Sequence, residues 1–179
     1  MELGLLVLRV VVGLLFVGHG AQKLFGLFGG HGLQGTAGFF EQGLGLRPGK
    51  LHATGAGAAE FFGGALLALG LFTPFAAAAL IGTMAVAIAT VHWSKGVWTT
   101  EGGYEYNAVL MAVAFAVTAV GPGNWSLDHQ FGFDIQGAGW AIGALVVGIV
   151  GGLGMMAAGK SAGARASRAQ AGTGRPTTA

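Results

Sequence analysis

Long apolar runs separated by short polar stretches make up most of this chain. Runs long enough to cross about 30 Å of hydrocarbon as a helix occur at residues 3–25, 54–71, 74–93, 105–120 and 138–158. In lipid, a helix satisfies its backbone polar groups internally. The pattern predicts an all-α integral membrane protein with five transmembrane helices, the fifth of them C-terminal.

The connections between these runs differ in length. The second and third runs are joined by the short link "LFTP", where Pro74 suits the first turn of a helix, so they are expected to form an antiparallel hairpin. The first connection, residues 29–52, is long and semi-polar. Its apolar positions recur at helical spacing, which predicts a short helix at the membrane interface.

Composition supports a membrane location and narrows the chemistry. The 179 residues are 53% hydrophobic and 9% charged, with a mean hydropathy of +0.67, whereas soluble domains carry about 25% charge. The chain has no cysteine, so it can form no disulfide and hold no thiolate-bound metal or cluster. We expect no metal site and no covalently bound cofactor.

Charge asymmetry predicts the orientation. Lys23, Lys95 and the basic tail fall on one side of five crossings, whereas Glu2 and Asp128 fall on the other. The positive-inside rule then places the N-terminus outside and the C-terminus in the cytoplasm of a bacterial plasma membrane. The tail's basic residues are interpreted as topology signals, so no nucleic-acid partner is expected. The expected organisation is a membrane domain at 1–130, an additional helix at 131–159 and a basic disordered tail at 160–179.

Because consecutive helices alternate in direction, four helix ends share one membrane face, and polar residues gather there. They are His19, Gln22, Lys23, Glu60, His92, Glu105 and Asn107. A charge deep in lipid costs about 2.5–3.5 kcal/mol on insertion scales, so such residues are expected to pair or to share a cavity. Small residues accompany them: Gly13 and Gly20 share a face with Lys23, which indicates the bundle interior.

We assign these residues two sets of roles. Glu60, His19 and His92 are the candidate catalytic, proton-handling residues; Lys23, Gln22, Glu105 and Asn107 are the candidate cofactor-binding residues. Structural alternatives remain open. Lys23 and Glu105 lie near helix ends and could snorkel to the interface, His92 could belong to an aromatic belt, and His19 could bond a neighbouring helix. His31, His52 and His129 are expected to be solvated in loops.

Arg9 lies about two turns inside the opposite face. Asp128, in "GPGNWSLDH", or a backbone carbonyl there is its expected partner. We interpret Arg9 and Asp128 as a structural pair that clamps the first helix to the fourth.

These features together resemble the DoxX family of small bacterial membrane proteins, over about residues 5–130. The similar segments are Arg9 with "HGAQKLFG", "GTAGFFEQGLG", "AAEFFGGALLALGLFTP", "VHW", "EYNAVLM" and "GPGNWSLD". The resemblance implies a four-helix membrane bundle whose relatives are linked to thiosulfate:quinone oxidoreduction and to membrane oxidoreductase complexes in oxidative-stress defence. It implies no catalytic residues.

Three functions fit these features, and the sequence leaves open whether the chain is an enzyme. The first is a quinone-interacting subunit or accessory of a membrane oxidoreductase, with electrons exchanged with a partner. The second is a carrier or proton-coupled channel that uses the same ionisable residues as its path. The third is a non-catalytic membrane anchor for a soluble enzyme.

Overall fold

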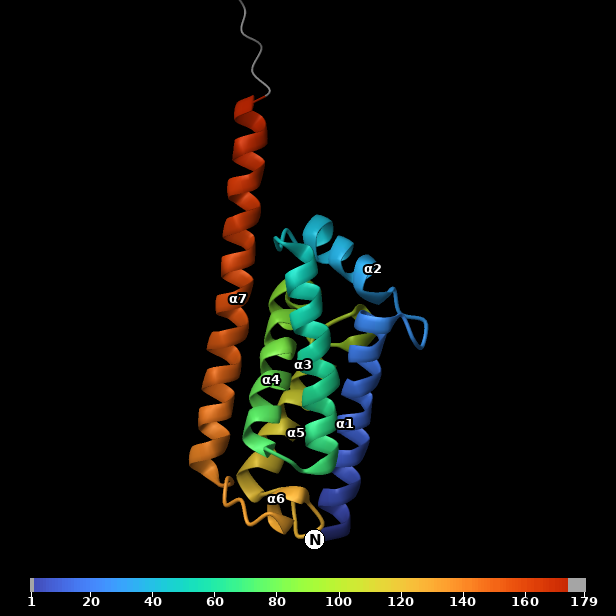
Figure 1. Cartoon of the computed structure of the whole chain (residues 1–179), viewed down its shortest axis with the longest axis vertical. Helices are drawn as coiled ribbons and strands as arrows, with labels where there is room; N and C mark the ends of the chain where they lie inside the picture. Colours follow the sequence, from blue (N-terminus) through green and yellow to red (C-terminus); the bar gives the residue numbers. More distant parts are fainter. Residues whose placement is uncertain (1, 174–179) are drawn as a thin grey trace, which may run out of the picture.

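The computed structural model describes residues 2–173, with side chains through Ala169, and this part of the chain is helical with no strand. In Figure 1 the long helices of the bundle lie side by side, with the C-terminal helix along one flank and a short helix across one end. The α-helices are α1 (Glu2–Phe25), α2 (Gly32–Gly38), α3 (Gly49–Leu69), α4 (Thr73–Ala87), α5 (Glu105–Val120), α6 (Leu127–Gln130) and α7 (Ala138–Thr173). Two π-helical segments, η1 (Phe39–Gly43) and η2 (Ile88–His92), and two 3₁₀ turns, η3 (Trp93–Lys95) and η4 (Thr99–Glu101), complete the order.

All five apolar runs form helices, and together they make an all-α integral membrane protein. Within the described residues, three helical segments are long and apolar enough to cross a membrane: Glu2–Phe25, Thr73–Lys95 and Ala138–Ala169. α5 is apolar but has only 16 residues. α3 has 21 residues, long enough to cross, but Glu60 and several glycines lower its apolar character.

The two predicted connections are also present. Gly70 and Phe72 take left-handed backbone conformations between α3 and α4, and Pro74 lies in the first turn of α4, which makes the expected tight hairpin. The long first connection contains α2 and η1, so the expected short helix is confirmed. α3 begins at Gly49, five positions before the predicted 54.

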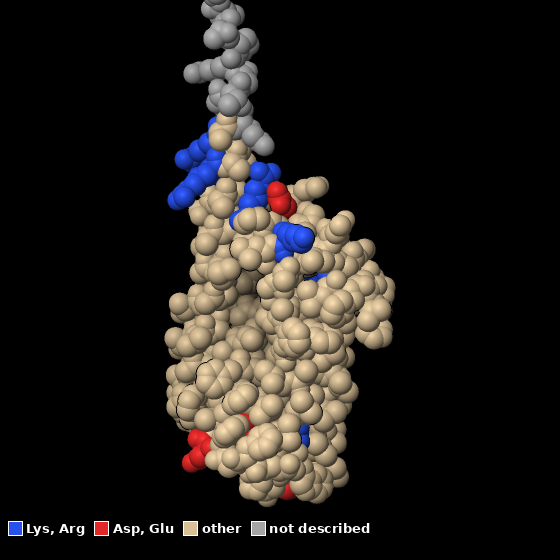
Figure 2. Space-filling view, viewed as in Figure 1, with Lys and Arg blue, Asp and Glu red and all other residues tan. Residues whose placement is uncertain are grey.

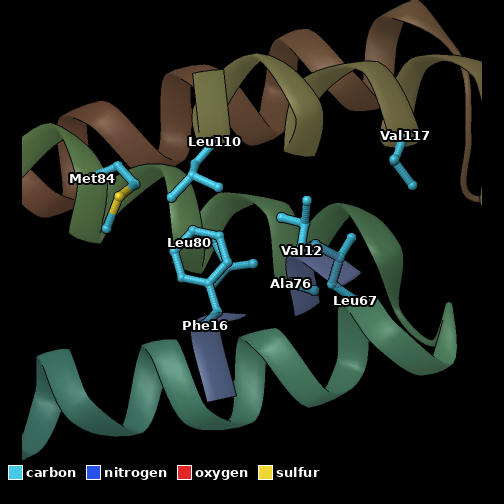
Figure 3. Packing of buried hydrophobic residues seen from close by; sticks show 8 residues of the cluster. All are labelled: Val12, Phe16, Leu67, Ala76, Leu80, Met84, Leu110 and Val117. Carbon is cyan, nitrogen blue, oxygen red and sulfur yellow. The ribbon is translucent and has the colours of Figure 1, made fainter. Parts of the chain in front are cut away.

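One apolar core joins α1, α3, α4 and α5. Figure 3 shows its eight buried residues, which point between these helices. They are Val12, Phe16, Leu67, Ala76, Leu80, Met84, Leu110 and Val117. On the outer faces many large apolar side chains are exposed, such as Leu14 on α1 and Val150 on α7. This distribution is typical of helices that face lipid, where exposed apolar area carries no hydrophobic penalty.

Glycines let α1 and α3 approach closely, as their shared faces predicted. A Cβ on Gly13 would lie 2.5 Å from the carbonyl oxygen of Gly64, and a Cβ on Gly64 would lie 2.5 Å from that of Gly13. A Cβ on Gly20 would lie 2.4 Å from the backbone nitrogen of Phe61. Backbone atoms cannot move aside as side chains do, so the two helices would have to separate. This contact holds Glu60 against the end of α1.

α7 packs on α4 and α5 and is longer than predicted. A small cluster of Ala77, Ile81, Ala114 and Ala144 seats its first half. The expected disorder from residue 160 is wrong through Thr173, because this alanine-rich segment continues the helix. The last six residues of the expected tail lie outside the described residues. At 36 residues, α7 is roughly 54 Å long and exceeds the hydrocarbon thickness by about 24 Å.

Candidate functional site: a polar cavity at one end of the bundle

A cavity of about 730 Å³ lies where the predicted polar helix ends converge. Its polar lining includes residues from all four bundle helices: His19, Lys23, Glu60, His92 and Asn107. Figure 2 shows the surface hollowed between the column of α7 and the neighbouring helices. Five of the seven candidate residues that were predicted to converge thus line one cavity.

An ion pair between Lys23 and Glu60 lies at the centre of this site. The ammonium Nζ of Lys23 donates to Oε2 of Glu60, across the α1–α3 contact. The Glu60 side chain is 4% exposed, whereas that of Lys23 is 26% exposed. Lys23 therefore turns inward to neutralise the buried carboxylate rather than snorkelling freely to the interface. Removing either partner would leave the other charge poorly compensated.

His19 is oriented by a short hydrogen-bond chain. Its Nδ1 lies 3.2 Å from Oε1 of Gln22, whose Nε2 donates at 3.0 Å to the carbonyl oxygen of Phe28. Because Gln22 must present its oxygen to His19, the proton of the neutral ring lies on Nδ1, and Nε2 is left as an acceptor. Gln22 itself does not line the main cavity, so its expected role as a direct ligand is replaced by support of His19.

His92 is oriented in the same way from another element. It ends the π-helical segment η2, and its Nδ1 lies 2.7 Å from the carbonyl oxygen of Gly102. A carbonyl only accepts, so the neutral ring again carries its proton on Nδ1 and leaves Nε2 as an acceptor. π-helical turns often occur at functional sites, and η1 also lines the cavity, through Phe39 and Phe40.

The α5 candidates separate into one lining residue and one loop anchor. Asn107 is buried, lines the cavity and donates to the sulfur of Met84 at 3.3 Å. Glu105 does not line the cavity; its Oε1 accepts a hydrogen bond of 3.0 Å from the backbone nitrogen of Thr99. Its position in the first turn of α5 lets it cap the preceding loop, and the structure places Glu105 outside the cavity where a ligand role was expected.

Several lining residues escaped the sequence analysis. Tyr106 packs edge-on to His19 with ring centroids 6.5 Å apart, and Met155 and Met156 come from α7. His52, expected to be solvated in a loop, is half-buried on α3 and lines the cavity. Tyr106 and Leu110 are four residues apart, so the sequence could have placed them on the same face of α5.

At the opposite end of the bundle, Arg9 and Asp128 are both buried but do not form the expected ion pair. Within the described residues, Arg9 donates to the backbone carbonyls of Ala68 and Trp125. Asp128 accepts from the backbone nitrogens of Phe72 and Thr73 at 2.7 and 3.0 Å, and from the Thr73 hydroxyl at 2.7 Å. The expected Arg9–Asp128 pair is therefore wrong, because both oxygens of Asp128 bind donors of Phe72 and Thr73 instead. The alternative, a backbone carbonyl partner for Arg9, is confirmed.

The fold and the site together define a small helical membrane protein with an ionisable cavity inside its bundle. No group of three or more potential metal ligands occurs in the described part. The DoxX family model matches residues 4–93, half of the chain, so the protein belongs to the DoxX family. No curated protein and no solved structure matches it. The match ends at Trp93, so the similar segments beyond it and α7 are additional to the matched region.

Proposed function

We propose that this DoxX-family protein is a quinone-interacting subunit or accessory of a membrane oxidoreductase system in the bacterial plasma membrane, acting in oxidative-stress defence or sulfur-compound oxidation. The observation that carries the proposal is the cavity that joins the buried Lys23–Glu60 pair to two oriented histidines within apolar walls. Its volume of about 730 Å³ falls within the roughly 300–1,000 Å³ usual for small-molecule sites.

The hydrogen-bonding groups suit the reduced form of a quinone. In their neutral tautomers both histidines offer Nε2 as an acceptor, which matches the hydroxyl group of a quinol. Lys23 offers a donor and Glu60 an acceptor at the same end of the cavity. When bound, a quinol supplies an electron pair and its hydroxyl protons.

Glu60 is proposed to take up one of the two hydroxyl protons, and Nε2 of His19 or His92, which accepts the hydrogen bond of the other hydroxyl, takes up the second. A carboxylate already paired with Lys23 can change its charge while the ammonium stays close. Because the chain has no cysteine for a cluster or a thiol couple, the proposal assigns the electron acceptor to a partner oxidoreductase.

The first test is analysis of lipids extracted from the purified protein, together with its absorbance spectrum. Quinone should co-purify with the parent protein and with the control variant Glu41→Gln. Glu41 is a matched carboxylate that lies outside the main cavity and pairs with Arg47 at 3.3 Å. Glu60→Gln should insert normally yet lose redox-linked function in cells, and His19→Ala should retain less quinone. Absence of quinone from the parent, with an unchanged phenotype for Glu60→Gln, would refute the proposal.

A second candidate is a membrane anchor for a soluble enzyme. It is supported by the end of α7, which continues about 24 Å beyond the hydrocarbon thickness and carries the exposed Lys160, Arg165 and Arg168. Deleting residues 164–179 separates the two candidates. The anchor function requires loss of partner recovery in the membrane fraction, whereas quinone binding should persist.

A further inference from the structure

One wall of the cavity is supplied by α7, which lies outside the family match of residues 4–93. The α7 residues that line it are Val147, Gly148, Gly151, Gly152, Met155 and Met156. Residues of α3 such as Gly55 and Ala59 line the same cavity. The additional helix therefore belongs to the site and is not merely attached to the bundle.

α7 is attached to the bundle at two places along its length. Toward its start, a Cβ on Gly148 would lie 2.6 Å from the carbonyl oxygen of Ala78, and one on Gly152 would lie 2.6 Å from that of Gly82. Toward its end, the backbone nitrogen of Arg47 donates to the carbonyl of Gly159 at 3.1 Å. Between these attachments, Met155 and Met156 border the cavity.

The side of the cavity between α3 and α7 is open. α7 makes its extensive contacts with α4 and α5, and none of that extent with α3 within the described residues. Gly55 of α3 and Gly151 of α7 both line the cavity, both are exposed, and a Cβ on either would meet no atom within 4 Å. Small residues on both sides thus leave a gap that large side chains would fill.

This gap lies at the depth of the hydrocarbon. Gly151 follows the start of α7 by about 20 Å along the helix axis, within the roughly 30 Å that a bilayer core spans. Val150 beside it is 66% exposed, as expected for a side chain against lipid. An opening at this depth leads to acyl chains rather than to water.

We infer that the gap between α3 and α7 is a lateral portal, through which a long-chain quinol passes from the bilayer to the Lys23–Glu60 pair. The inference rests on the proposed function. The head group lies at the polar end, and its hydrocarbon chain lies between Gly55 and Gly151 and against Met155. A tailed amphiphile fits because the polar groups gather at one end of the cavity while the open side is apolar.

Phenylalanine substitutions on one helix test the portal against a matched control. Gly151→Phe places a ring in the gap. Gly154→Phe makes the same change on the same helix, at an exposed glycine outside the cavity lining with no atom near its Cβ direction. Each variant is placed in nanodiscs, mixed with vesicles that contain a long-chain quinol, separated after timed intervals and extracted. Gly151→Phe should take up quinol about tenfold more slowly than Gly154→Phe, within the range by which on-rates vary among mutants.

A second variant tests the opposite side of the gap. Gly55→Phe should slow uptake as Gly151→Phe does, provided that both elute as the parent does and keep its helical circular dichroism. Equal uptake by all three variants, with quinol bound to the parent, would overturn the portal and leave the proposed function intact. A parent protein that takes up no quinol would overturn both.

Discussion

The two ends of the bundle both bury charged side chains, but they satisfy them differently. Arg9 and Asp128 are each 2% exposed at one end, and Glu60 is 3% exposed at the other. Arg9 and Asp128 are held mainly by backbone groups near chain turns, whereas Glu60 is held by a partly exposed lysine beside a cavity.

This difference separates a structural role from a functional one. Asp128 has both oxygens bound to donors in and around the α3–α4 turn and is buried, so it is not accessible to a ligand. The Lys23–Glu60 pair lines open space and can exchange partners there. Burial of a charge is therefore a weak indicator of function on its own, and the kind of partner decides the role.

The largest expected effect on stability is that of Asp128→Ala. The change leaves the Thr73 hydroxyl and two backbone N–H groups without their acceptor. Since a hydrogen bond to a charged group contributes about 1.5–3 kcal/mol, we expect a loss of about 3–5 kcal/mol. Thermal unfolding in detergent measures it, with the exposed Asp134→Ala as a control that should change stability by less than about 0.5 kcal/mol.

Arg9→Met should cost somewhat less, about 2–4 kcal/mol, because its methylenes are kept while the donors to Ala68 and Trp125 are lost. Combined with Asp128→Ala, the effects should be nearly additive, with a coupling of about 1 kcal/mol or less through the shared turn. A direct ion pair would instead make the double change much milder than the sum. A double-mutant cycle in detergent distinguishes the two arrangements.

At the cavity end, Glu60→Gln should destabilise the fold by only about 1–2 kcal/mol. The amide keeps a hydrogen bond with Lys23, and the partly exposed Lys23 ammonium can turn toward solvent once the carboxylate is gone. The double variant Lys23→Met with Glu60→Gln removes both charges and should recover part of this loss. Unfolding midpoints of the three proteins give the comparison. A loss as large as that of Asp128→Ala would contradict the distinction between the ends.

Cysteine substitutions that report the orientation of the chain in the membrane are expected to affect the fold least. Figure 2 shows most of the visible basic residues at the end where α7 projects, with one acidic patch among them, and the other visible acidic residues toward the opposite end. The chain has no cysteine, so Gln130→Cys and Ala164→Cys each introduce a single thiol at an exposed position of the acidic and the basic end. An impermeant maleimide on intact cells should label Gln130→Cys alone; labelling of Ala164→Cys alone would reverse the proposed orientation.

The sequence predicted the helices and the convergence of their polar ends because both follow from run length and alternating direction. Depth along a helix brought His19, Glu60 and His92 together without any knowledge of packing. The glycine face of α1 was predicted to point into the bundle interior, and it does so in its close contact with α3.

What the sequence missed depended on local backbone geometry and on long-range contacts. Depth placed Glu105 near Asn107, but residues two apart on an α-helix point in directions about 200° apart around its axis, and of these two only Asn107 lines the cavity. Charge complementarity suggested that Arg9 meets Asp128, whereas Arg9 donates to the backbone carbonyls of Ala68 and Trp125. Asp128 accepts from two backbone N–H groups and the Thr73 hydroxyl. The role of α7 as a cavity wall required knowing which face of the bundle it covers.

Equilibrium binding tests most directly whether the Lys23–Glu60 cavity binds a quinol through Glu60. A long-chain quinol is titrated into nanodiscs that contain the parent protein, Glu60→Gln or Glu41→Gln. We expect saturable binding to the parent and to Glu41→Gln, and binding about tenfold weaker to Glu60→Gln. This loss of affinity is expected because a charge-assisted hydrogen bond to the quinol becomes a neutral one. Equal affinity for all three proteins, or no saturable binding to the parent, would contradict quinol binding through Glu60.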